Sequence, residues 1–336
     1  MRRAGAAACL ALVLLPVAGV AAVAAPPAGG RVELVAGDGL QEPFGVAFDR
    51  EGRTYIVEMG GNRVTVLDGR GGRRILAGDF RGPHHLLLGP EGALFVTDTG
   101  NNRVRRFDLR TGQSTIVAGT GEKGFGGDGG PATAAQFGGI YSIAFHQGAL
   151  YICDLDNRRV RAVDPRTGVV TTVAGNGEKG VPRDGEDART QPLFDPRAIA
   201  LDTKGNLYIC ERGGHALRVV DPAGKIRTVV GTGVAGGSGD GGPARAAQLN
   251  GPKHIFVERS GDVLITDTEN HVIRRYSPRD GTIRRVAGTG VPGTGGLGGP
   301  ALGCPFNRPH GAVIHPRTGE LYIADSENHR VLRVRR

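Results

Sequence analysis

Tyr322-Ile323-Ala324-Asp325, a short apolar run that ends in an acid, decides the fold because the chain contains six versions of it. The other five align with it without gaps: Tyr55-Ile56-Val57-Glu58, Phe95-Val96-Thr97-Asp98, Tyr151-Ile152-Cys153-Asp154, Tyr208-Ile209-Cys210-Glu211 and Leu264-Ile265-Thr266-Asp267. The acids are spaced by 40, 56, 57, 56 and 58 residues. A fixed period of this size indicates a repeat architecture, which has to be explained before any single residue.

The units around these segments share one internal order. A short apolar run follows a Pro, as at 46–48, and the repeated segment comes next, after a turn that contains Gly. Two more apolar runs follow, as at 103–107 and 115–118. Four short strands joined by turns rich in Gly and Asp describe one propeller blade. We therefore predict an all-β fold, a six-bladed β-propeller of four-stranded blades.

The two ends of the repeat region predict how the ring closes. The sixth unit ends with its third strand, Val331–Val334, and has no fourth. The segment 31–37 precedes the first unit and resembles fourth strands such as 285–288. We expect 31–37 to be the outer strand of blade six, because this pairing removes an exposed strand edge. The predicted propeller domain is 31–336.

The first 30 residues have the pattern of an export signal. Arg2 and Arg3 precede the apolar run 6–24, which ends in a small-x-small cleavage site. We expect a signal peptide over 1–24, a short linker over 25–30, and a secreted or periplasmic protein. No later stretch approaches the roughly 18 uninterrupted apolar residues that a membrane helix needs, so we expect no transmembrane span.

The charge balance is basic but restricts the partners little. The chain has 42 basic and 33 acidic side chains, a net charge of +9 and a pI near 9.8. Such a field attracts anions and acidic partners, but it is also usual in an Arg-rich proteome. Basic charge alone is weak evidence for nucleic-acid binding. For an exported protein we expect no nucleic-acid partner.

Asn-His pairs in the polar turns carry a family resemblance. They occur as Asn270-His271 and Asn328-His329, with Asn-Arg at 62–63, 102–103 and 157–158. With the repeat, these pairs make 31–336 resemble the NHL-repeat family of six-bladed propellers. The resemblance implies the fold and leaves the function open, because NHL propellers bind proteins, RNA or small ligands and a few relatives are lyases.

Residues that recur at one position in several blades are expected to have structural roles. The repeated acids are predicted to accept backbone N–H bonds and fix the turns. We give the same interpretation to His215, His271 and His329, which share the neighbouring position. Cys153 and Cys210 replace small residues of the repeated segment and are expected to be buried, whereas the pairing of Cys304 stays open.

The blades differ at the residues that open each first strand, at the mouth of the central channel. These are Phe44-Gly45, His84-His85, Tyr141-Ser142, Arg197-Ala198, Lys253-His254 and His310-Gly311. Variation on a constant scaffold is where a binding site is normally built. The predicted ligand-binding residues are therefore His84, His85, Tyr141, Arg197, Lys253, His254 and His310.

This mixture resembles in kind the NHL-like peptidyl-hydroxyglycine amidating lyases, where channel histidines hold zinc and a Tyr and an Arg assist. The resemblance makes His84, His254 and His310 the candidate ligands for zinc or another divalent metal. It makes Tyr141 and Arg197 the catalytic candidates. Side chains alternate along a strand, however, so each orientation supplies two histidines and not three. A bulge could add a third, but the sequence shows none.

Four long Gly-rich linkers join a fourth strand to the next first strand and emerge on the face where the channel mouth opens: 119–139, 175–196, 231–252 and 288–309. Long loops on one face suit recognition. Asp128, Asp184 and Asp240 in these linkers have too few acidic neighbours for calcium and are expected to form turns. We expect an exported, monomeric binding module for a protein, peptide or envelope polymer, which uses this face and the channel mouth. The alternative is a metal-dependent lyase or hydrolase with its site at the mouth.

Overall fold

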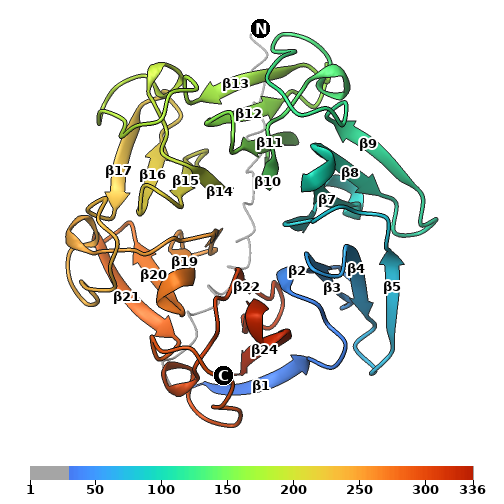
Figure 1. Ribbon diagram of the computed structural model, residues 1–336, viewed down its shortest axis with the longest axis vertical. Coiled ribbons are helices and arrows are strands. Elements are labelled where there is room, and N and C mark those ends of the chain that lie inside the picture. Colours follow the sequence, from blue (N-terminus) through green and yellow to red (C-terminus); the bar gives the residue numbers. More distant parts are fainter. Residues whose placement is uncertain (1–29, 336) are drawn as a thin grey trace, which may run out of the picture.

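Six four-stranded antiparallel sheets surround a central axis in the computed structural model, which describes residues 30–335 (Figure 1). From the inside outward, blade one consists of β2 (Pro43–Phe48), β3 (Thr54–Glu58), β4 (Arg63–Leu67) and β5 (Arg73–Ala77). Blade two consists of β6 (Leu86–Leu88), β7 (Leu94–Asp98), β8 (Arg103–Phe107) and β9 (Ser114–Ala118). Blade three consists of β10 (Ile140–His146), β11 (Ala149–Asp154), β12 (Arg159–Val163) and β13 (Val170–Ala174). Blade four consists of β14 (Pro196–Leu201), β15 (Leu207–Glu211), β16 (Ala216–Val220) and β17 (Ile226–Val230). Blade five consists of β18 (His254–Val257), β19 (Val263–Asp267), β20 (Val272–Ser277) and β21 (Thr282–Ala287). Blade six consists of β22 (Gly311–Ile314), β23 (Leu321–Asp325), β24 (Arg330–Arg335) and β1 (Arg31–Ala36). The predicted six-bladed propeller is confirmed.

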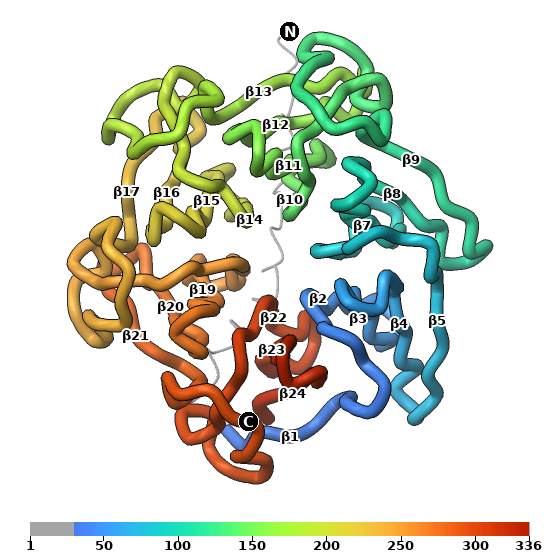
Figure 2. The backbone as a smooth tube through the Cα atoms, viewed as in Figure 1, coloured from blue at the N-terminus to red at the C-terminus, as the bar shows by residue number. Residues whose placement is uncertain are grey.

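The ring closes as predicted, with the first strand of the chain completing the last blade. β1 lies beside β24, although the two strands are at opposite ends of the chain (Figure 2). They pair antiparallel with Val32 opposite Val334, and Glu33 and Arg333 form an ion pair of 2.7 Å. On the inner side, a Cβ at Gly311 would lie 2.4 Å from the carbonyl oxygen of Phe44. This close approach of blades six and one therefore requires glycine at position 311.

The core consists of apolar layers between neighbouring blades. Every residue of β3, β7, β15, β19 and β23, which carry the repeated segment, is buried. The linkers add to these layers through single-turn 3-10 helices: η3 (Ala132–Ala134), η4 (Ala188–Thr190), η5 (Ala244–Ala246) and η7 (Ala301–Gly303). Ala132 at the start of η3 packs with Val104 of blade two and Ile152 of blade three, so the linker fills the gap between these blades.

The other 3-10 helices within residues 30–335 form turns inside blades: η1 (Pro90–Gly92), η2 (Thr99–Asn101), η6 (Thr268–Asn270) and η8 (Ser326–Asn328). Three of them directly follow a repeated acid. No helix in this part of the chain is both long and apolar enough to cross a membrane. The predicted signal peptide, 1–24, lies outside the described residues.

All six repeated acids accept a backbone N–H, as predicted. The donors are Gln41 for Glu58, Arg81 for Asp98, Gly138 for Asp154, Phe194 for Glu211, Asn250 for Asp267 and Asn307 for Asp325, at 2.7 to 2.9 Å. An arginine adds an ion pair to each acid; Arg218, for example, lies 2.8 Å from Glu211. Burial nevertheless raises the pKa of Asp154 and of Asp267 to about 6. Each acid therefore connects its blade to the segment that precedes the inner strand of the same blade.

The three histidines of the neighbouring position connect adjacent blades. The Nδ1 atoms of His215, His271 and His329 accept the backbone N–H groups of Gly251, Arg308 and Glu42, each in the next blade around the ring. All three histidines have a positive φ, between 47° and 56°. Their structural interpretation is confirmed.

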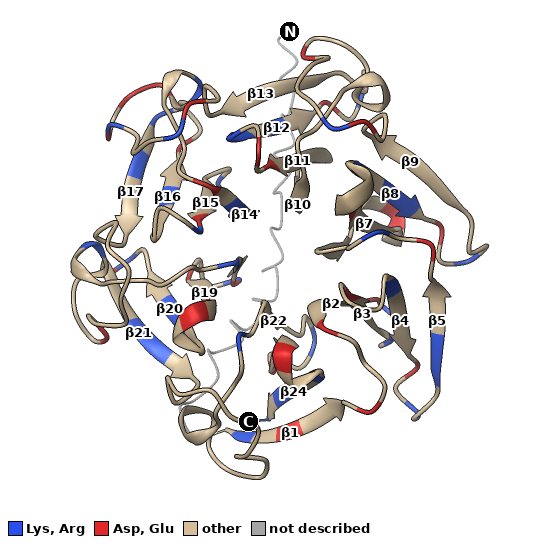
Figure 3. Cartoon of the chain, viewed as in Figure 1, with Lys and Arg blue, Asp and Glu red and all other residues tan. Residues whose placement is uncertain are grey.

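The cysteines and the linker aspartates also have structural roles. Cys153, Cys210 and Cys304 are buried free thiols. Asp128 and Asp240 accept hydrogen bonds from Arg161 and Arg274, and Asp184 from Thr228. Basic and acidic residues are distributed around all six blades (Figure 3). The net positive charge is thus spread over the molecule.

Candidate functional site

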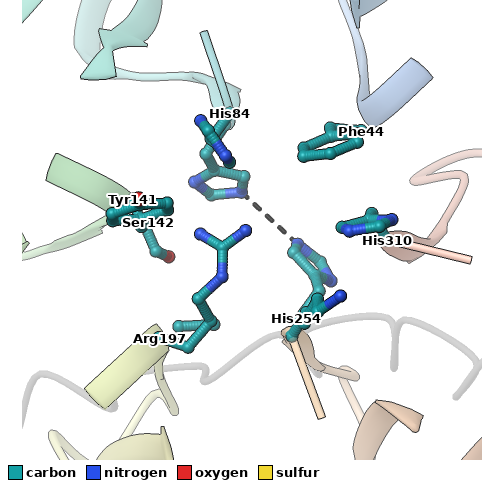
Figure 4. A pocket seen from close by; sticks show the side chains of 10 residues that line it. Phe44, His84, Tyr141, Ser142, Arg197, His254 and His310 are labelled. Carbon is teal, nitrogen blue, oxygen red and sulfur yellow. Dashed lines mark hydrogen bonds between the residues drawn. The ribbon is translucent and has the colours of Figure 1, made fainter. Parts of the chain in front are cut away.

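The seven predicted ligand-binding residues come together at the start of the inner strands, where they line one cavity at the channel mouth (Figure 4). The complete lining is Phe44, His84, His85, Tyr141, Ser142, Arg197, Ala198, Lys253, His254 and His310. The cavity has a volume of about 10 Å³, which is room for one water molecule. A ligand can therefore place only a small terminal group between these side chains.

Three β-bulges, which the sequence did not reveal, shape the mouth. The pairing of β2 with β3 skips Phe44, that of β10 with β11 skips Tyr141, and that of β14 with β15 skips Arg197. A bulged residue is not paired with the neighbouring strand, and the local bend of the strand changes the direction of the residue's side chain. The regular alternation that we assumed for all inner strands is wrong at these positions. The bulges contribute a Phe, a Tyr and an Arg to the mouth, and no additional histidine.

Five side chains from neighbouring blades stack around the upper part of the mouth. Phe44 lies flat against His310, with ring centroids 3.8 Å apart, and meets His84 edge-on at 5.0 Å. His84 contacts the ring of Tyr141 at 4.5 Å. The guanidinium of Arg197 lies 4.0 Å from the centroid of the Tyr141 ring. The stack runs without interruption from blade six through blades one, two and three to blade four.

Two histidines from opposite blades form a bar across the channel below this stack. The Nε2 atoms of His85 in blade two and His254 in blade five are 3.4 Å apart. The other residues at this level are small: Gly45, Ser142, Ala198 and Gly311. This size difference lets the two imidazoles meet. The predicted grouping of His85 with His254 is what the structure shows.

The hydrogen bonds of the bar fix its tautomers. The backbone N–H of Ile143 donates to His85 Nδ1 at 3.2 Å, so the neutral ring carries its proton on Nε2. His85 Nε2–H then donates to His254 Nε2, which leaves the proton of His254 on Nδ1. His254 Nδ1 is buried and has no hydrogen-bond partner among residues 30–335. The bar thus ends in one unsatisfied donor.

Arg197 is a buried positive charge without a carboxylate partner. The residue is 5% exposed, its Nε has no hydrogen-bond partner, and it forms no ion pair within residues 30–335. Burial lowers its pKa to about 10, so it stays protonated at neutral pH. Lys253 also lines the mouth, but it is paired with Glu269 at 2.8 Å. The uncompensated charge of the mouth therefore lies on Arg197.

The four histidines of the mouth are held neutral. Burial and the nearby Arg197 lower the pKa of each, that of His85 to about 4. His84 Nδ1 lies 2.8 Å from the carbonyl oxygen of Gly82, and His310 Nδ1 lies 2.9 Å from that of Arg308. As hydrogen-bond donors at Nδ1, both rings present the lone pair of Nε2.

The same geometry argues against a zinc site at the mouth. His84 and His310 are anchored through Nδ1 in the way that metal-binding histidines are. His85 and His254 are occupied with each other, and no group of three or more His, Cys, Asp or Glu suited to a metal occurs in the described part of the chain. The guanidinium that lowers the histidine pKa values also repels a cation. The residues at the mouth do not fit the zinc suggested by the lyase resemblance.

A second and larger cavity lies beyond the bar, at the opposite ends of the inner strands. Its volume is about 350 Å³, and it is lined by the last residues of β2, β6, β10, β14, β18 and β22 together with His85 and His254. Apart from the histidines, its lining is apolar. The sequence analysis considered only the first residues of these strands. The signal was present, because each inner strand continues as an apolar run such as Leu86-Leu87-Leu88.

Comparison with known proteins relates this chain to a family of repeat proteins. The sequence pattern of the NHL repeat matches residues 306–333, the last blade. The chain is also 24% identical over 265 residues to NHL repeat-containing protein 2 of Gallus gallus. The aligned region covers 71% of this chain and 36% of that protein. The chain is therefore a six-bladed propeller with an NHL repeat in its last blade. The predicted resemblance is confirmed.

Other relatives of this NHL propeller differ in size and context. It is 30% identical over 208 residues to Protein SUPPRESSOR OF QUENCHING 1, chloroplastic, of Arabidopsis thaliana, over 54% of this chain and 19% of that protein. The chain thus spans about a fifth to a third of the length of these curated relatives.

Solved structures share the fold of the NHL propeller. An auxiliary nutrient binding protein from Bacteroides ovatus superposes with a TM-score of 0.66 and 20% identity, over 90% of this chain and 72% of that one. Virginiamycin B lyase from Staphylococcus aureus superposes with a TM-score of 0.56 and 13% identity, over 91% and 99%. At these identities the likeness extends to the fold and not to the site.

Proposed function

We propose that this NHL propeller is an exported recognition protein that captures an anionic group of a protein, peptide or envelope polymer at its channel mouth. The observation that carries the proposal is Arg197, a residue that is only 5% exposed and whose guanidinium has no carboxylate partner among residues 30–335. An isolated buried charge costs several kcal/mol, and an ion of opposite charge offsets this cost.

A carboxylate or phosphate tip matches the mouth in charge, and the cavity has room for one of its oxygens. The guanidinium offers N–H donors in a planar fork, the geometry that binds two oxygens of one anion. The neutral rings of His84 and His310 add no competing charge. A cavity of about 10 Å³ admits only the tip of a ligand, so the rest of the ligand has to lie outside the cavity.

The linker face supplies apolar contacts for such a partner. Of eight large apolar side chains that are exposed within residues 30–335, five lie in the long linkers: Phe125, Val181, Val234, Val291 and Leu297, at 47 to 65% exposure. These side chains belong to four linkers at separate places around the rim of the ring, so only an extended partner that also occupies the mouth would contact several of them (Figure 1). A solved structure with this fold is named an auxiliary nutrient binding protein, which agrees with a binding role.

The export signal pattern at 1–24 supports a site of action outside the cytoplasm, with the protein acting as a monomer and without a nucleic-acid partner. The runner-up function is a metal-dependent lyase or hydrolase. One observation favours it, the Nδ1 anchoring of His84 and His310, which leaves both Nε2 atoms without a hydrogen-bond partner in the described part of the chain. The positive charge of Arg197 opposes it. Metal analysis of protein grown with zinc, compared with the His84→Ala variant, separates the two functions: one bound ion per chain that is lost in the variant would favour the enzyme.

The test of the proposed function is a titration with acetate, with N-acetyl-alanine and with its amide as the neutral control. Binding is measured by isothermal titration calorimetry and by the ¹⁵N shifts of the histidine side chains. We expect both carboxylates to bind and the amide not to bind. Arg197→Met should abolish binding, and Arg197→Lys, which keeps the charge but loses the fork, should weaken it about tenfold. Equal binding of acetate to the wild type and to Arg197→Met would refute the proposal.

A further inference from the structure

The apolar cavity beyond the histidine bar, which we name the lower chamber, has properties of a second binding site. It is lined by the last residues of all six inner strands and by both histidines of the bar. Its volume of about 350 Å³ corresponds to roughly twelve water molecules at about 30 Å³ each and falls in the range of small-molecule pockets. The chamber lies at the end of the channel opposite the long linkers, because the inner strands begin at the mouth and end here.

Apolar side chains of the lower chamber remain incompletely buried in the free protein. Phe48, Leu88, Phe145 and Val257 line it from four different blades, and each is only partly buried. Apolar surface gains about 25 cal/mol per Å² when it leaves water. The chamber therefore favours an apolar occupant over water.

One polar feature interrupts the apolar lining. His254, which separates the mouth from the lower chamber and lines both, carries its proton on Nδ1 by the tautomer argument above. This N–H has no partner among the described residues and almost no accessible surface, so an oxygen in the chamber reaches it only when the imidazole ring turns. A buried unsatisfied donor costs about 1–3 kcal/mol, and a ligand oxygen that accepts from it removes this cost.

We infer that the lower chamber binds a small, neutral, largely apolar molecule with a single hydrogen-bond acceptor, such as a ketone or aldehyde oxygen. The imidazole of His254 turns so that the oxygen accepts from Nδ1–H, and the apolar body fills the space between the ends of the inner strands. Charge distinguishes this ligand from the one proposed for the mouth. No charged residue among 30–335 lines the lower chamber, whereas Arg197 contributes to the mouth and not to the chamber.

The test uses acetophenone and ethylbenzene, which have similar size and differ in the carbonyl oxygen. Methyl NMR on the full chain, labelled at Leu, Val and Ile, locates each compound through the signals of Leu88, Val257 and Ile314 in the lower chamber. We expect acetophenone to shift these signals and to bind about two- to tenfold more tightly than ethylbenzene, which is the effect of one hydrogen bond.

Three variants decide the location and the donor. Ala200→Phe fills the lower chamber from β14 and should abolish binding of both compounds, and Leu88→Phe is the second choice if Ala200→Phe does not fold. His254→Phe keeps a ring in the bar but removes the donor, so the preference for acetophenone should disappear. Arg197→Met is the matched control, because it removes the acetate site and should leave acetophenone binding unchanged.

The results separate the two proposals. Acetophenone binding that persists in Ala200→Phe, or shifts confined to methyl groups outside the lower chamber, would overturn the chamber site. Acetate binding depends only on the mouth and should be retained in Ala200→Phe. Loss of acetate binding in Arg197→Met with intact acetophenone binding supports both sites independently.

Discussion

The six repeated acids and the channel mouth both bury ionisable side chains, but they treat them in opposite ways. Each acid, such as Glu211, accepts a backbone N–H and faces an arginine. Arg197 at the mouth is buried to a similar degree and has neither a hydrogen bond to its Nε nor an ion pair within residues 30–335. Buried charges that are fully partnered within the fold serve the fold. A buried charge that the fold leaves unpartnered points to a ligand from outside.

The largest expected effect comes from removing one of the six partnered acids. Glu211→Ala removes a side chain with no exposure and leaves Arg218, only 3% exposed, without its carboxylate. We expect urea unfolding to show a loss of about 3–5 kcal/mol in the free energy of unfolding. Acetate binding should be unchanged in the fraction that is folded. Glu122→Ala in a linker is the control, because this exposed acid should change stability by less than about 0.5 kcal/mol. A loss below about 1 kcal/mol for Glu211→Ala would mean that the acids are not structural.

The second prediction concerns the pH dependence of the free energy of unfolding, which a histidine of the mouth should influence. His85 has a pKa of about 4 in the fold against 6.5 in the unfolded chain. Between pH 6.5 and 4 the unfolded chain takes up a proton that the folded chain does not, so stability present above pH 6.5 is lost as the pH falls. At 1.36 kcal/mol per pKa unit the loss approaches about 3 kcal/mol.

His85→Gln isolates this contribution. Gln accepts the Ile143 N–H and donates to His254 without titrating, so the variant should match the wild type near pH 7 and lose less stability at pH 4. Asp154 and Asp267, whose raised pKa values act with the opposite sign, cancel in the difference between the two proteins. Parallel curves of unfolding free energy against pH for both proteins would contradict the prediction.

The contrast between the two regions also explains what the sequence predicted and what it did not. The acids perform one duty in each blade, so the same residue type returns at a regular spacing, and the fold, the ring closure and the structural histidines could be predicted. The membership of the mouth was predictable from its variation between blades. Its geometry was not, because the bulges at Tyr141 and Arg197 are a matter of strand register, and the bar joins residues 169 positions apart. The apolar runs of the inner strands indicated an apolar lining for the lower chamber, but its volume depends on how the ends of six strands pack around the axis.

The third effect is opposite in sign to the first. Arg197→Met replaces a buried charge without a carboxylate partner by an apolar side chain of similar length. We expect this variant to be more stable than the wild type by about 1–2 kcal/mol in anion-free buffer, after the loss of the cation–π contact with Tyr141. Adding acetate should reduce the difference, because the anion stabilises only the wild type. Thermal unfolding with and without acetate measures both changes. A variant less stable than the wild type would indicate that Arg197 has a structural partner after all.

The smallest expected effect concerns the contacts between blades, where His271 Nδ1 accepts the N–H of Arg308 at 3.0 Å. His271 has a φ of 56°, so His271→Ala loses the hydrogen bond and places alanine in the left-handed region, a combined cost of about 1–2 kcal/mol. Asn62, at the corresponding position of blade one, has a φ of 52°, and its side-chain oxygen accepts the N–H of Gly82 at 2.7 Å. His271→Asn should therefore cost less than about 0.5 kcal/mol, because Asn tolerates this conformation and provides the same acceptor. Urea unfolding of both variants at pH 7 tests this order. If Ala and Asn were equally destabilising, the imidazole ring itself would matter at this position, and these histidines would belong with the mouth and not with the repeated acids.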